Sequence, residues 1–183
     1  MNNTLFIEPK TLKNKSNKPN IKILDATFFL PDSGLNAKEE YKKKHIPNSV
    51  FFDVNKIADP NNPLPHMIPS KELFSQMMQN LGINNDDEII IYDNSPLLSS
   101  ARAWFLFRYF GHENIFILNG GLKNWEKNGG EITNKKTIVS IGDFQSKTEK
   151  KDLVVGLNEM ISFSNNNSKL ILDARSYKRF TGE

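Results

Sequence analysis

The chain has 183 residues, of which 38% are hydrophobic, and this is enough apolar material to bury one core. Its 24 basic and 21 acidic residues leave a net charge of only +3, without a basic stripe interleaved with aromatic residues, so we expect no nucleic-acid partner. It has no cysteine, which excludes cysteine chemistry. It also has no apolar run long enough to cross a bilayer and no secretory signal after Met1, so we expect a cytoplasmic protein without membrane contact.

Strands and helices are predicted to alternate from residue 21 onward. Residues 21–25 alternate apolar and polar side chains, which is typical of a short strand. A charged surface helix is expected from its cap, Asn36, to Lys44, with Glu39 as the capping-box partner. Residues 49–52 then predict a buried strand.

A proline-rich stretch, residues 53–69, follows this strand and predicts a long irregular loop. Ser70 is expected to cap the next helix, whose apolar residues form one stripe and which Gly82 ends. Such a stripe is typical of core packing.

The alternation continues beyond this helix. Residues 88–92 predict an apolar strand, and residues 100–110 predict a helix so apolar that it should be largely buried. Another strand is expected over 115–118, and Gly120-Gly121 forms a tight turn into a last helix. The pattern favours an α/β fold with a mostly parallel sheet and helices on both faces.

A short internal repeat suggests a second domain. Ile-Leu-Asp-Ala occurs at residues 23–26 and again at 171–174, each time after an asparagine-rich polar turn. Residues 133–152 are polar and lysine-rich without helical periodicity, so we expect a linker there between a first domain, 1–132, and the start of a second, 153–183.

The second segment is expected to contain one helix, over residues 155–163, and one strand at the repeat. This is too little to bury a core by itself.

Several motifs in order resemble those of the rhodanese-like family. His45-Ile46-Pro47-Asn48-Ser49 is similar to the His-Ile-Pro-Gly-Ala that opens a strand in these domains. The other motifs that carry the resemblance are Phe51-Phe52-Asp53, Leu64-Pro65-His66-Met67-Ile68-Pro69, Ile91-Tyr92-Asp93, Ser100-Ala101-Arg102-Ala103-Trp104, residues 118–125 and Asp173-Ala174-Arg175 with Arg179-Phe180.

The resemblance is to the N-terminal half of a two-domain sulfurtransferase of the mercaptopyruvate or thiosulfate type. It implies that two rhodanese domains pack together and that a cysteine in the second transfers sulfane sulfur from a small donor to a thiophilic acceptor, without a cofactor. In this first domain Asp93 stands at the position of that cysteine. A carboxylate cannot accept sulfane sulfur, so the chain by itself is expected to be inactive and this loop to be structural.

The resemblance also implies a role for a histidine in the proline-rich loop. In mercaptopyruvate-type members such a histidine, here His66, reaches across the domain interface to the catalytic pocket, where an imidazole can move a proton. Asn55 stands where some members have a carboxylate; it can hold the ring but cannot stabilise an imidazolium, and Asp53 is a weak substitute. The alternative is a loop histidine that fills a surface notch.

Arg102 lies in the first turn of a helix, where its charge opposes the helix dipole. We therefore expect a structural ion pair with Asp93 or Asp53. The three histidines of the chain lack the spacing of metal ligands, so no metal is expected.

A second interpretation is a complete, non-catalytic rhodanese-like module that binds a partner. Asp93 at the catalytic position fits that interpretation. The segment after residue 153 argues against it, because the apolar face of its strand would remain uncovered.

Overall fold

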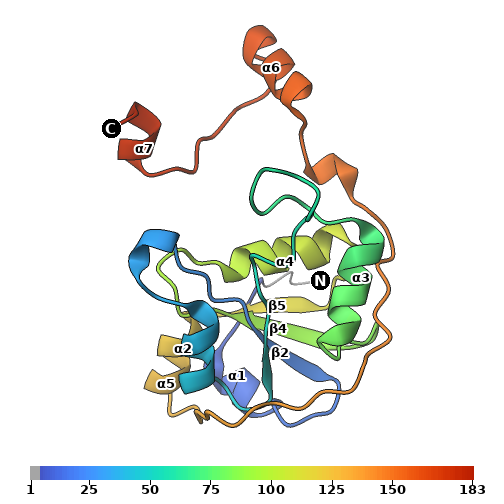
Figure 1. Ribbon diagram of the computed structural model, residues 1–183, viewed down its shortest axis with the longest axis vertical. Helices are drawn as coiled ribbons and strands as arrows, with labels where there is room; N and C mark the ends of the chain where they lie inside the picture. The colour runs from blue at the N-terminus through green and yellow to red at the C-terminus, as the bar shows by residue number, and fades with distance from the viewer. Residues whose placement is uncertain (1–4) are drawn as a thin grey trace. The chain divides into compact units, whose positions relative to one another are not determined.

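The computed structural model describes residues 5–183, which fall into two compact units divided after Glu149 (Figure 1). The first unit is built on a five-stranded sheet in the order β1-β5-β4-β2-β3, and all its paired strands are parallel. The strands are β1 (Phe6–Ile7), β2 (Ile21–Asp25), β3 (Ser49–Phe51), β4 (Glu88–Tyr92) and β5 (Ile115–Leu118). The expected parallel α/β architecture is confirmed.

The central strand β4 pairs with β2 through Ile23↔Ile90 and with β5 through Ile90↔Phe116. Ile89, Ile90 and Ile91 are all fully buried. A continuous apolar run of this kind fits a strand that is covered on both faces.

Helices cover both faces of the sheet, with α3 and α4 on one side and α1 and α5 on the other (Figure 1). Because alternate strand residues point to opposite faces, Leu24 and Ile91 pack toward α3 and α4, whereas Ile23 and Ile90 pack toward α1 and α5. The helices of this unit are α1 (Pro9–Lys13), α2 (Ala37–Lys43), α3 (Lys71–Asn80), α4 (Ser100–Tyr109) and α5 (Gly121–Lys127), with a short 3₁₀ helix at Pro31–Ser33.

The predicted helix caps are in place. The side chain of Asn36 accepts hydrogen bonds from the backbone N–H groups of Lys38 and Glu39, at 3.0 and 3.2 Å. The capping box is incomplete, because the Glu39 carboxylate pairs instead with Lys42 at 2.7 Å. Ser70 accepts from Leu73 N–H at 3.2 Å and starts α3.

Asn48 takes the place of the glycine in the family's His-Ile-Pro-Gly-Ala motif, and it has φ +64°. Asparagine tolerates this left-handed conformation better than most residues. The turn is closed by Ser49 N–H, which donates to Ile46 O at 3.0 Å, and leads directly into β3.

Helix α4 is less deeply buried than its composition predicts. Leu106 and Phe107 lie in the core, but Trp104 and Phe105 are only partly buried and Ala101 is exposed. The helix packs one face on the sheet, so its remaining aromatic residues meet solvent or loops.

The linker expected over residues 133–152 requires a correction, because residues up to Glu149 belong to the first unit. Phe144 is 1% exposed and packs among the core aromatics Phe74 and Phe107. The backbone N–H groups of Gly142, Phe144 and Lys147 donate to the carbonyls of Gln79, Ile83 and Phe110 at 2.9, 3.1 and 3.1 Å. We call residues 133–149 the strap; it is a segment without helix or strand, held by the buried ring of Phe144 and by hydrogen bonds to carbonyls near the ends of α3 and α4.

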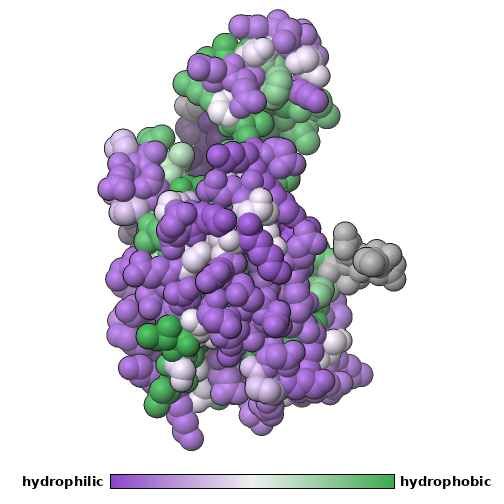
Figure 2. All heavy atoms as spheres, turned by 90° about the vertical axis from the view of Figure 1, so that its right-hand side faces the viewer, coloured by the Kyte–Doolittle hydropathy of each residue, from purple (hydrophilic) through white to green (hydrophobic). Residues whose placement is uncertain are grey.

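The second unit, residues 150–183, contains a 3₁₀ helix (Lys151–Leu153), α6 (Leu157–Asn166) and α7 (Tyr177–Thr181). Figure 2 shows hydrophobic side chains at the surface of α6. Leu157 and Ile161 of this helix are 76% and 49% exposed. Within residues 151–183, Phe163 is partly buried and every other residue is exposed. The unit therefore has no core of its own.

The strand expected at residues 171–174 is not formed, and Ile171 and Leu172 are exposed. The first copy of this motif lies in β2, which has a hydrogen-bonded neighbour on each side. The second copy has no neighbouring strand within its unit, so its backbone groups lack ladder partners. Among the described residues, no helix is both long and apolar enough to span a membrane.

Candidate functional site

The carboxyl ends of β2 and β4 meet at one edge of the sheet, the edge at which open α/β sheets bind their ligands. Side-chain hydrogen bonds tie the two following loops together. Asp25 Oδ1 accepts from Thr27 N–H at 2.9 Å, and Thr27 Oγ1 accepts from Asn94 N–H at 3.0 Å. The loop after β4, residues 93–99, is thus fixed against the loop after β2.

Asp93 begins this loop, and its carboxylate is turned into the protein. Its Oδ2 accepts from Ser100 N–H, the first residue of α4, at 2.8 Å, and its Oδ1 accepts from Ser95 N–H at 3.4 Å. The side chain is 7% exposed. The N-terminus of α4, which attracts negative charge, is therefore occupied by a carboxylate of the chain itself.

The backbone of Asp93 is packed equally closely. Its carbonyl accepts from Leu122 N–H at 3.0 Å, at the start of α5. A Cβ atom on Gly121 would lie 2.3 Å from that carbonyl oxygen, and Gly121 has φ +58°, so only glycine fits there.

Two buried ionisable residues, Asp25 and Tyr92, are the last residues of β2 and β4. Burial raises the pKa of Asp25, against the lowering effect of its hydrogen bonds with Thr27. Burial is also the main cause that raises the pKa of Tyr92 well above its ordinary value, with the nearby Asp25 carboxylate adding to it. The Tyr92 hydroxyl accepts from Ile46 N–H and lies 3.2 Å from Ser49 Oγ, so it acts as an interior anchor for the turn before β3.

His66 lies in the proline-rich loop with its ring held on two sides. Its Nε2 lies 2.8 Å from Asn55 Oδ1, so Nε2 carries a proton and donates it, and Nδ1 is free of this contact. The ring also packs edge to face on Phe28, with centroids 5.1 Å apart. The contact between His66 and Asn55 that the family resemblance implies is therefore present.

Phe28 connects His66 to the loop that follows β4. Its backbone N–H donates to Ser99 Oγ at 3.1 Å, and the same hydroxyl donates to Ala26 O at 2.7 Å. Phe28 and Ser99 do not appear among the predicted site residues. Neither belongs to a chemically suggestive motif, and only tertiary packing brings them beside His66.

The expected ion pair of Arg102 is not observed. Its Nη2 donates to the main-chain carbonyl of His66, while Asp93 caps α4 and Asp53 Oδ1 accepts from Asn55 N–H at 3.2 Å. Both carboxylates instead accept hydrogen bonds from backbone N–H groups. Burial lowers the pKa of Arg102.

A cavity of about 360 Å³ opens beside the 93–99 loop. Its walls are mostly apolar side chains such as Phe6, Leu98 and Ile117, and Lys123 and Ser95 provide polar groups. Among residues 5–183, no cluster of three histidine, aspartate or glutamate side chains is arranged to hold a metal ion.

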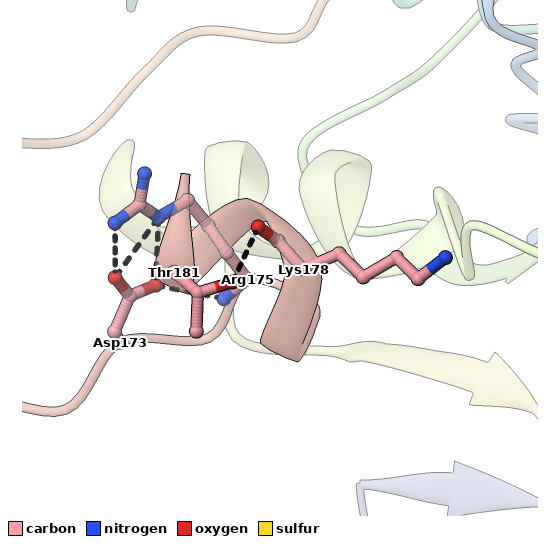
Figure 3. Close-up of polar contacts among 4 residues, drawn as sticks. All are labelled: Asp173, Arg175, Lys178 and Thr181. Carbon is pink, nitrogen blue, oxygen red and sulfur yellow. Dashed lines mark hydrogen bonds and ion pairs between the residues drawn. The ribbon is translucent and has the colours of Figure 1, made fainter. Parts of the chain in front are cut away.

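The second copy of the repeat keeps one local feature of the first. Asp173 Oδ1 accepts from Arg175 N–H at 2.9 Å, as Asp25 Oδ1 does from Thr27 N–H. The Arg175 guanidinium also donates to both carboxylate oxygens, from Nε at 3.0 and 2.9 Å (Figure 3). These hydrogen bonds lower the pKa of Asp173 to about 2.

Residues 8–128 match the model of the rhodanese-like domain. The chain is 35% identical to the 3-mercaptopyruvate sulfurtransferase of Escherichia coli K12, over all of this chain and 65% of that protein. It is 44% identical to the mitochondrial thiosulfate/3-mercaptopyruvate sulfurtransferase 1 of Arabidopsis thaliana over 115 residues, which are 63% of this chain and 30% of that protein. The chain thus spans less than two thirds of the length of either relative.

Solved structures agree with these sequence matches. The crystal structure of SseA, a 3-mercaptopyruvate sulfotransferase from Escherichia coli, superposes with a TM-score of 0.90 at 35% identity, over 97% of this chain and 68% of that one. Tum1 from Saccharomyces cerevisiae superposes with a TM-score of 0.86 at 29% identity, over the whole of this chain and 64% of that one. With its parallel sheet, its motifs in order and these matches, the chain belongs to the rhodanese-like family, in which its relatives are sulfurtransferases.

Proposed function

We propose that this chain is the non-catalytic N-terminal rhodanese domain, with the first part of the second domain, of a two-domain sulfurtransferase that takes sulfane sulfur from mercaptopyruvate or thiosulfate. The observation that carries the proposal is Asp93. It stands at the strand-loop-helix position of the family's cysteine, and its carboxylate occupies the N-terminus of α4 at 2.8 Å from Ser100 N. The chain contains no cysteine, so by itself it would form no persulfide.

The proposed contribution of this domain to catalysis is His66. Its imidazole is half-buried, oriented by Asn55, and keeps Nδ1 available to accept a proton. In the complete protein we propose that the second domain packs on this surface and brings its cysteine and the bound sulfur donor to the ring. A histidine at this place favours mercaptopyruvate as the donor, because a proton-transferring group suits a 2-oxo acid leaving as its enolate.

The second unit supports a tandem arrangement. It repeats Ile-Leu-Asp-Ala with the same aspartate turn, and it exposes apolar side chains that a folded domain would cover. A thiol that cycles through a persulfide works best in a reducing compartment, so we propose the cytoplasm as the site of action, although one relative is mitochondrial.

The experiment joins the 183-residue chain to the part of the Escherichia coli enzyme that lies beyond the matched region. We expect sulfur transfer from 3-mercaptopyruvate to a thiol by the fusion and none by the isolated chain. A fusion that unfolds cooperatively as one protein yet transfers no sulfur would favour the binding-module interpretation. Transfer by the isolated chain above a buffer blank would contradict the assignment of this domain as non-catalytic.

A further inference from the structure

Arg102 is a half-buried cation whose one hydrogen bond to protein goes to a main-chain carbonyl. Its Nη2 donates to His66 O, and the only cause that moves its pKa is burial, which lowers it. Among the described residues no carboxylate pairs with this guanidinium. Removing a charge from water without an opposite charge is unfavourable, so the contact with His66 O is the compensation that the fold provides.

The carbonyl that Arg102 binds belongs to a residue in an unusual backbone conformation. His66 has φ +59°, in the left-handed region that residues other than glycine rarely adopt. Such a conformation persists only where the surroundings hold it. Asn55 and Phe28 hold the ring of His66, but Arg102 holds its main chain.

We infer that Arg102 is a positioning residue for His66, which fixes the main chain of the histidine so that its ring is presented with Nε2 on Asn55 and Nδ1 free. A charged donor makes the hydrogen bond to the carbonyl stronger than a neutral one would. The role of the His66 ring in sulfur transfer rests on the proposed function. The positioning of the His66 main chain by Arg102 does not depend on that function.

Arg108 provides a matched comparison on the same helix. It also is half-buried, but it contacts the Glu113 carboxylate at 3.8 Å and lies 5.8 Å from the centre of the Trp104 ring. Within residues 5–183, Arg108 forms no hydrogen bond, ion pair or ring contact with His66, Asn55 or Phe28. Replacing Arg108 removes the same charge from α4 and leaves the hydrogen bond between Arg102 and His66 O unchanged.

The test is NMR of the histidine rings in the 183-residue chain, labelled with both ¹³C and ¹⁵N, at pH 8, where an ordinary histidine of pKa about 6.5 is neutral. His66→Gln assigns the His66 signals. In the unmutated chain we expect one protonated and one unprotonated ring nitrogen, and a scalar coupling across the hydrogen bond from Arg102 Nη2 to the His66 carbonyl carbon. In Arg102→Met we expect the two ring-nitrogen shifts to move toward each other and the cross-relaxation between His66 and Phe28 to weaken.

Two variants complete the design. Arg102→Lys keeps a charged donor and should lie nearer the unmutated chain than Arg102→Met does, and Arg108→Met should leave the His66 signals unchanged. Signals of His45 and His112 report whether the fold is intact. The inference is overturned if a folded Arg102→Met has unchanged His66 signals, or, should that variant unfold, if the unmutated chain lacks the coupling. A fusion protein that keeps full activity after His66→Gln would overturn the proposed role of the ring and leave the role of Arg102 standing.

Discussion

Asp93 Oδ2 accepts a hydrogen bond from Ser100 N–H at 2.8 Å, and this contact makes the aspartate the cap of α4. Ser99 stands directly before the helix, but its hydroxyl donates to Ala26 O and makes no cap contact. The N-terminus of α4 is thus capped by a residue seven positions before the first residue of the helix. The partial positive charge at the N-terminus of α4, which would otherwise stabilise an anionic sulfur, is balanced by the carboxylate of Asp93.

Replacing Asp93 with alanine should destabilise the first unit by about 1 kcal/mol, the usual cost of losing a helix cap. The measurement is the free energy of unfolding in urea, followed by circular dichroism. Asp93→Asn keeps an oxygen acceptor for Ser100 N–H and should lose less. An alanine variant as stable as the unmutated chain would show that the carboxylate does not cap α4.

Phe144 anchors the strap, so Phe144→Ala should cost about 3–5 kcal/mol, the range for deleting a buried aromatic side chain. Phe144 is 1% exposed and lies 5.8 Å, between ring centres, from Phe74. Ile138 is 91% exposed in the same strap, so Ile138→Ala should change the stability by less than about 0.5 kcal/mol. Equal effects of the two substitutions would mean that residues 133–149 behave as a free linker.

Asp25 makes stability depend on pH in the direction opposite to most carboxylates. Because burial raises its folded pKa above the usual 3.8, the stability that its protonated form contributes is present below that pH and is lost as the pH rises through the folded value. Asp25→Asn cannot ionise and should therefore be more stable than the unmutated chain at neutral pH. The gain should shrink as the pH falls toward 3.8.

The test of that dependence is the difference in unfolding free energy between Asp25→Asn and the unmutated chain, measured in urea from acid to neutral pH. Asp32→Asn, at an exposed position of the 3₁₀ helix Pro31–Ser33, is the control for removing a carboxylate from the surface. A difference for Asp25→Asn that does not vary with pH would show that the carboxyl is not the titrating group.

Much of the fold follows from local sequence patterns. The strand at Glu88–Tyr92 and the helix that Ser70 caps are visible as an apolar run and an apolar stripe, and both occur where they are predicted. The short β1 and α1 lie outside the predicted elements. A strand of only two residues, Phe6–Ile7, has no periodicity to detect and exists because it pairs with β5.

Neither the packing of the strap nor the hydrogen-bond partner of Arg102 could be predicted, and the physical reason is the same for both. Phe144 is the single apolar anchor of a polar segment, and Arg102 donates to a main-chain carbonyl, a group that every residue carries. Composition and charge indicate neither contact. The contact between His66 and Asn55 is expected only from the resemblance to the rhodanese-like family, and the two side chains make it.

We propose that this domain supplies His66 to an active site that a second domain completes. The most direct measurement is kcat/KM of the fusion protein and of its His66→Gln variant, with 3-mercaptopyruvate and with thiosulfate as donors and with Leu64→Ala as the control in the same loop. We predict that His66→Gln lowers kcat/KM for 3-mercaptopyruvate about 10²-fold or more, the usual contribution of a proton-transferring group, and changes the thiosulfate reaction and the control little. Equal rates with 3-mercaptopyruvate for His66→Gln and the unmutated fusion would contradict this role of His66.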